Sequence, residues 1–158
     1  MGMKGTVRWI DDALFLGGSG SGHSVVMDGP PEAGGRNLAA RPMEMLLLGL
    51  GGCTAFDVVH ILRKARVRVT SCQVDLTAER APSPPQVFTR IHIHFILSGE
   101  GLSKDHVERA INLSAEKYCS ASIMLGKTAE ITHDFEIIAS AQSFSTNRRK
   151  RSARSRAQ

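Results

Sequence analysis

Several features that would place a chain in a familiar class of protein are scarce in this 158-residue sequence. Cysteine occurs three times, an odd number at scattered positions, which excludes the paired framework of a small secreted disulfide scaffold. The longest apolar run without a charge, residues 45–56, has 12 residues, whereas a bilayer-spanning helix needs about 20. The N-terminus lacks the basic-then-apolar pattern of a signal peptide. We therefore expect a cytoplasmic protein without a membrane span.

Acidic residues are also fewer than basic ones, 15 against 20, so the formal net charge is +5 and the pI is about 9.5. Six of the 20 basic residues lie between Arg148 and Arg156, where there is no acid. The rest of the chain has 14 basic and 15 acidic residues, so its body is close to neutral. The basic segment has no aromatic residue for base stacking and no apolar face for membrane insertion. We predict a folded domain over residues 1–141, a disordered basic tail over 142–158, and no specific nucleic-acid partner.

The hydrophobic pattern predicts strands and helices that are partly segregated along the chain, which is typical of an α+β fold. Expected strands cover residues 6–10, 14–16, 23–27, 70–79, 87–97 and 129–138. Expected helices run from Pro42 to Lys64 or Arg66, from Ser103 to about Cys119, and briefly over 120–126. In the strand over 87–97, the residues expected to face inward are Val87, Thr89, Ile91, Ile93, Phe95 and Leu97. The second helix is expected to bury Val107, Ala110, Ile111, Ser114 and Tyr118.

The helix that begins at Pro42 is apolar on every face over its first half, so one thin sheet cannot cover it. Gly49, Gly51 and Gly52 each cost about 1 kcal/mol relative to alanine inside a helix. We expect compensation from close approach to another element, or from space for a substrate beside Cys53. A large central helix under a curved sheet is one interpretation of the apolar surface, and burial against a second subunit is the favoured one.

Two cysteines occupy positions that suit chemistry as well as packing. Cys53 lies among glycines, where a leucine would fill space better, and Cys119 lies just past a helix end. The free amides of a following helical turn would favour a thiolate at Cys119. Cys72 falls on the inward face of its strand and is interpreted as a core residue. Asp57, at i+4 from Cys53, is on the same helix face and would oppose a thiolate there if close.

Three other patterns are candidate sites with a more ordinary interpretation. His92 and His94 project from one strand face as a candidate zinc pair, but no further ligand has a useful spacing, so a solvated face is favoured. His60 lies two helical turns from Cys53, about 10.5 Å, too far for a nucleophile and its base within one chain. The glycine and serine run over residues 17–22 lacks the phosphate-loop pattern and predicts a turn.

Residues 41–55 (RPMEMLLLGLGGCTA) and 114–122 (SAEKYCSAS) resemble the central helix and the second cysteine segment of the OsmC/Ohr family. These are the osmotically inducible and organic-hydroperoxide-resistance proteins, and the similarity extends over roughly residues 4–138. The resemblance implies an intertwined homodimer, in which long central helices are enclosed by antiparallel sheets. It also implies a cysteine-based thiol peroxidase that reduces organic hydroperoxides in oxidative-stress defence.

In that family pattern Cys53 is the peroxidatic cysteine, Cys119 the resolving cysteine and Glu44 the active-site carboxylate. Arg36 or Arg41 would supply the family's arginine. No metal, flavin or other cofactor is expected, and an external dithiol, such as a lipoyl group, would restore the thiols. Glu44 lies nine residues before Cys53, which is 180° around an ideal helix. Either the glycines bend the helix, or Glu44 serves the partner subunit's site, and the second is the favoured hypothesis. The alternative function is a non-peroxidatic OsmC-like dimer that binds a hydrophobic small molecule in its interface cleft.

Overall fold

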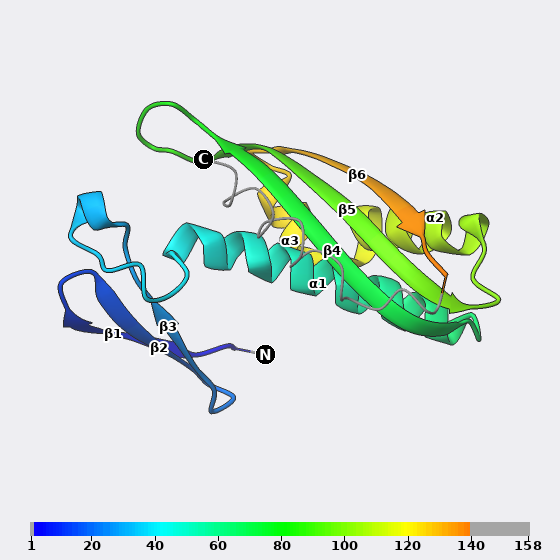
Figure 1. The fold of residues 1–158 in the computed structure, drawn as a ribbon, viewed down its shortest axis with the longest axis horizontal. Coiled ribbons are helices and arrows are strands. Elements are labelled where there is room, and N and C mark those ends of the chain that lie inside the picture. Colours follow the sequence, from blue (N-terminus) through cyan, green and yellow to red (C-terminus); the bar gives the residue numbers. More distant parts are fainter. Residues whose placement is uncertain (1, 140–158) are drawn as a thin grey trace, which may run out of the picture. The chain divides into compact units, whose positions relative to one another are not determined.

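The computed structural model describes residues 2–139, so the predicted tail over 142–158 lies outside the described residues. The described chain divides into an N-terminal unit that ends at Gly49 and a C-terminal unit that begins at Leu50. Three strands, a long helix, two strands, a helical segment and a last strand follow one another, as Figure 1 shows. This order confirms the predicted α+β class.

The N-terminal unit is built on an antiparallel meander. Its strands are β1 (Gly5–Asp11), β2 (Leu14–Ser19) and β3 (Ser24–Met27), and they pair in the order β1-β2-β3. A single helical turn, η1 (Pro31–Ala33), follows β3, and the first turns of α1 (Pro42–Lys64) complete the unit. Proline is well suited to a first helical position because its missing N–H would have no partner there.

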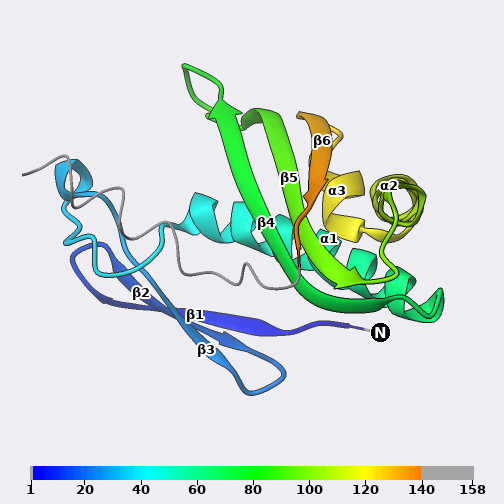
Figure 2. The same cartoon turned by 45° about the vertical axis from the view of Figure 1, so that its right-hand side comes forward.

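The C-terminal unit packs helices on a three-stranded sheet (Figure 1 and Figure 2). The strands β4 (Arg68–Arg80), β5 (Phe88–Glu100) and β6 (Glu130–Ile137) lie in the order β4-β5-β6. β4 and β5 form the predicted hairpin, whereas β6 runs parallel to β5. The crossover between them contains α2 (Lys104–Leu113), the π-helical turn η2 (Ser114–Tyr118) and α3 (Ser120–Leu125).

The core of this unit gathers around the central strand β5. Every second residue of β5 faces inward: Ile91, Ile93, Phe95 and Leu97 are each at most 3% exposed. Leu50, Val58 and Leu62 of α1 and Val107, Ala110 and Ile111 of α2 are also buried. The burial of these α2 residues confirms the core stripe predicted for the second helix.

Two predicted core positions, Val87 just before β5 and Thr89 within it, are wrong. Val87 is 39% exposed and Thr89 is exposed, whereas Phe88, between them, is buried. The cause is a bulge, because the register slips between Glu79 and Arg80 so that Arg80 pairs with Phe88. A bulge inserts one residue into a strand and reverses which side chains face the core beyond it.

The predicted burial of Tyr118 is also wrong, since this residue is 51% exposed. The regular helix ends at Leu113, and the next five residues form η2, in which the N–H of Cys119 donates to the carbonyl of Ser114 at 2.8 Å. This wider turn delays the helical phase and rotates Tyr118 away from the core.

Among the residues that the structure describes, α1 is the one helix whose length and composition would allow it to cross a membrane, with a mean hydropathy of 1.8. Its uncharged apolar run is shorter than a bilayer requires, because Glu44 and Asp57 flank residues 45–56. The core helix of a globular domain can have the same length and hydropathy, and α1 buries Leu50, Val58 and Leu62 almost completely.

Candidate redox site at Cys53 and Cys119

The helix α1 packs very closely on the sheet next to Cys53. A Cβ atom at Gly51 would lie 2.6 Å from Cδ1 of Leu76 in β4, so a side chain there would have to displace Leu76. A Cβ atom added at Gly49 or Gly52, by contrast, would meet no atom within 4 Å. Close approach therefore explains one of the three helical glycines, and open space surrounds the other two.

The second cysteine is placed by the π-helical turn. Cys119 is the N-cap of α3, and its Sγ accepts the backbone N–H of Ser122 at 3.4 Å. This position confirms the prediction that Cys119 stands at the start of a helical turn. The side chain is completely buried, whereas that of Cys53 is partly exposed.

These two elements bring three chemically active groups together. The Sγ atoms of Cys53 and Cys119 and a carboxylate oxygen of Asp57 all lie within 4.8 Å of one another. Both cysteines are free thiols. The two sulfur atoms, 66 positions apart in the sequence, are thus near enough for rotation about their side-chain bonds to bring them into contact.

A chain of buried hydroxyl groups holds Asp57 in place. Ser114 Oγ donates to Asp57 Oδ2 at 3.3 Å, and Thr54 Oγ1 lies 3.1 Å from Ser114 Oγ. Because the Ser114 proton is directed to the carboxylate, the Thr54 hydroxyl donates to Ser114. The chain links α1 to the first residue of η2, the turn that leads to Cys119, and so fixes the spacing of the two thiols.

Burial controls the acidity of the second thiol. Loss of solvent raises the pKa of Cys119, hydrogen bonds from Ser122 act in the opposite direction, and the nearby Cys53 raises it further. Burial likewise raises the pKa of Cys72, the half-buried cysteine of β4. The net shift of the Cys119 pKa is upward, because burial outweighs the hydrogen bonds from the start of α3 that were expected to favour a thiolate there.

The other predicted site residues lie in the N-terminal unit and make local contacts there. Glu44 Oε2 accepts the backbone N–H of Arg41 at 2.9 Å, which caps the start of α1. Arg41 and Glu44 are both exposed in the chain.

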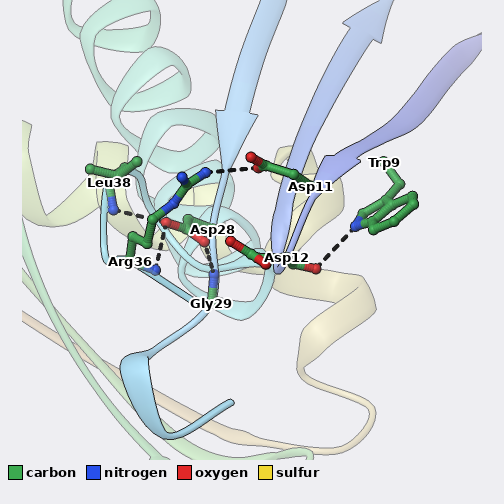
Figure 3. A network of polar contacts seen from close by, with 7 residues as sticks. All are labelled: Trp9, Asp11, Asp12, Asp28, Gly29, Arg36 and Leu38. Atoms are coloured by element: carbon green, nitrogen blue, oxygen red, sulfur yellow. Dashed lines mark hydrogen bonds and ion pairs between the residues drawn. The ribbon is translucent and has the colours of Figure 1, made fainter. Parts of the chain in front are cut away.

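Arg36 belongs to a network that the sequence did not reveal (Figure 3). The buried carboxylate of Asp28 accepts the backbone N–H groups of Gly29 at 2.7 Å, Leu38 at 3.0 Å and Arg36 at 3.2 Å. These bonds, the one from Leu38 foremost, lower the pKa of Asp28. The Arg36 guanidinium forms an ion pair with Asp11 at 2.7 Å. The loop that carries Arg36 is therefore anchored at both its backbone and its side chain.

The histidine pair of β5 has acid partners on the neighbouring strand β6. His94 Nδ1 and His92 Nε2 lie 2.6 Å and 3.1 Å from Asp134 Oδ1. The hydrogen bond with Asp134 is the main cause that raises the pKa of His94, and it lowers the pKa of Asp134. The sequence pattern did not reveal this acid, because a parallel crossover has no local signal for its register.

Comparison with known proteins gives a consistent picture. The profile of the family described as OsmC-like protein matches residues 34–134. Protein YhfA of Escherichia coli K12 is 48% identical over 137 residues, which cover 87% of this chain and 99% of YhfA. A crystal structure from Aquifex aeolicus is 26% identical with a TM-score of 0.77 and covers 88% of this chain and 98% of its own. The organic hydroperoxide resistance protein OhrB of Bacillus subtilis is 14% identical with a TM-score of 0.60, covers 86% and 98%, and shares the fold.

Proposed function

Because the chain belongs to the OsmC-like protein family, we propose that it is a thiol peroxidase that reduces organic hydroperoxides through Cys53 and Cys119. The observation that carries the proposal is the approach of both sulfur atoms to within 4.8 Å, on elements that are remote in sequence. The name of OhrB, which describes resistance to organic hydroperoxide, gives the class of substrate for this proposal.

The different exposure of the two thiols supports their assigned roles. A peroxide can reach the partly exposed Cys53, but it cannot reach Cys119, which is fully buried. Cys53 is therefore the peroxidatic cysteine of the proposal, and Cys119 is the resolving cysteine. The packing of α1 at Gly51 and the Ser114 hydrogen bonds hold the two close without a covalent link.

The proposed reaction has three steps. The Cys53 thiolate attacks the terminal oxygen of the hydroperoxide, the alcohol leaves, and the sulfur becomes a sulfenic acid. The Cys119 sulfur then attacks that sulfenic sulfur, so that a disulfide forms and water leaves with the Cys119 proton. A dithiol, of which a lipoyl group is the proposed example, exchanges with the disulfide and restores both thiols while it is itself oxidised.

We also propose that the working unit is a homodimer in the cytoplasm. Leu46, Leu48 and Phe56 of α1 are 53%, 56% and 72% exposed, an unusual state for large apolar residues on one long helix. A second copy of the chain would remove them from water. In this dimer Glu44 is proposed to serve the partner's thiol pair, with Arg36 or Arg41 as its arginine partner. Light scattering should give twice the 17.1 kDa mass of one chain.

The test of the peroxidase proposal is to treat the reduced full-length protein with cumene hydroperoxide and to titrate its thiols within seconds. We expect two thiols to disappear, with a Cys53–Cys119 disulfide identified by mass spectrometry. Cys53→Ser should abolish the reaction, and Cys119→Ser should leave a sulfenic acid on Cys53 that dimedone traps. Cys72→Ser is the matched control and should react like the wild type.

A wild-type protein that keeps all its thiols under these conditions would overturn the peroxidase proposal. If such a protein also retained a lipid-like molecule through purification, the alternative function, a dimer that binds a hydrophobic ligand, would replace it. Mixed dimers of Glu44→Ala and Cys53→Ser chains test the cross-subunit role of Glu44, because one intact site per dimer should be recovered.

A further inference from the structure

Asp57 anchors the hydroxyl chain, but peroxide reduction gives its charge no chemical role. A negative charge does not stabilise a neighbouring thiolate. Even so, the structure holds this carboxylate within 4.8 Å of both sulfur atoms and fixes it with a hydrogen bond from the buried Ser114. Three groups that become anionic share one partly buried space, and such groups are stable together when a cation neutralises them.

We propose that reduced Cys53, Cys119 and Asp57 form a binding site for a thiophilic divalent cation, of which Zn²⁺ is the best match. Two thiolates and one carboxylate are ligands that zinc prefers, and three protein ligands leave the fourth tetrahedral position for water. Binding transfers the two thiol protons to solvent and moves no electron.

The distances fit this geometry after small side-chain movements. Tetrahedral zinc with ordinary bond lengths separates two sulfur ligands by about 3.8 Å, and a sulfur from an oxygen by about 3.6 Å. The three ligand atoms lie within 4.8 Å of one another, so closure by about 1 Å is enough. Rotation about the side-chain bonds of the partly exposed Cys53, with a small turn of the Asp57 carboxylate that keeps Oδ2 bonded to Ser114, supplies that movement.

The groups around the ligands have the arrangement that metal sites need. A ligating carboxylate is usually held by a further hydrogen bond, and Ser114 Oγ donates one to Asp57 Oδ2 at 3.3 Å. The backbone N–H of Ser122 is directed at the Cys119 sulfur at 3.4 Å and would steady a thiolate there. The cation and the hydroperoxide would compete for the same sulfur atoms, and the disulfide would remove two of the three ligands.

The experiment is a titration of the reduced full-length protein with Zn²⁺ by calorimetry under anaerobic conditions, with Co²⁺ as a spectroscopic probe. We expect one Zn²⁺ per chain, thiolate-to-cobalt charge-transfer absorption, and no binding by the disulfide form. Asp57→Asn keeps the size of the side chain and should weaken binding at least about tenfold. Asp75→Asn, at an exposed position in β4, and Cys72→Ser are matched controls that should bind like the wild type.

A second measurement needs no substitution. Zn²⁺ should protect Cys53, the partly exposed ligand, from alkylation in the wild type and leave the partly exposed Cys72 as reactive as before. The proposed site would be overturned if the wild type bound no Zn²⁺, or if Asp57→Asn bound Zn²⁺ as tightly as the wild type. Zinc affinity is measured without peroxide, so the two proposals can fail separately. A chain that binds zinc but forms no disulfide with peroxide refutes only the peroxidase proposal. A chain that forms the disulfide but binds no zinc refutes only the zinc site.

Discussion

The hydroxyl chain behind the thiol pair gives a sharp prediction for Ser114→Ala. Ser114 is completely buried and Thr54 is 3% exposed, and no buried side-chain polar atom in the described part of the chain lacks a partner. The substitution leaves the Thr54 hydroxyl without its acceptor and takes a donor from Asp57. A buried polar group that loses its partner costs about 1–3 kcal/mol of unfolding free energy, and this is the expected loss.

The partner substitution Thr54→Val should cost less. Valine has nearly the same shape as threonine, and Ser114 keeps its bond to the charged acceptor Asp57, so the expected loss is about 1 kcal/mol. In the double variant the hydroxyl stranded by one change is removed by the other. Its loss should therefore be smaller than the sum of the single losses by about 0.5–1.5 kcal/mol.

Urea unfolding followed by circular dichroism measures all four proteins at one chain concentration, because a dimer would make stability depend on concentration. Ser120→Ala, at an exposed position close in sequence, is the matched control and should stay within about 0.5 kcal/mol of the wild type. Losses that simply add in the double variant would show that Thr54 and Ser114 are not coupled. The hydroxyl chain would then not be what fixes the spacing of the two thiols.

Three further predictions concern the fold outside the site. Arg66→Gly should raise the unfolding free energy by about 1 kcal/mol, because residue 66 has a φ of 62° that side chains disfavour. Arg66→Ala keeps a side chain at this φ, so its unfolding free energy, measured by urea unfolding, should not rise. Phe95→Ala should lower the unfolding free energy by about 3–5 kcal/mol, since the Phe95 ring is 1% exposed. A loss below about 1 kcal/mol would contradict the place of Phe95 in the core. Because its pKa is raised, His94 adds its full contribution to the unfolding free energy below pH 6.5 and loses it as the pH rises through the raised pKa. Asp134, whose pKa is lowered, adds its full contribution above pH 3.8 and loses it as the pH falls through the lowered pKa. NMR titration should show the pKa of His94 falling toward 6.5 in Asp134→Asn, and an unchanged value would exclude the pair as the cause.

The features that could be predicted are those that local sequence specifies. The start of α1 follows from Pro42 with Glu44 in the first turn, and the hairpin of β4 and β5 follows from alternation that breaks at a proline-rich connection. The approach of Cys53 and Cys119 came from family resemblance rather than from their spacing. Register between remote strands, which places Asp134 beside His94, depends on the whole crossover and has no local signature.

The errors in the predicted core, at the start of β5 and in η2, have one physical form, the insertion of a single residue into a regular repeat. At Thr89 the insertion is a bulge, and it affects only which side chains of β5 face inward at the strand's start. In η2 it widens one helical turn, so that Tyr118 points to solvent and Cys119 is buried at the start of α3. A regular helix would keep its 3.6-residue phase through this segment and leave the thiol elsewhere. The departure from helical periodicity that made the sequence prediction fail is therefore what positions the second sulfur beside Cys53, and π-helical turns are often found where function requires such a displacement.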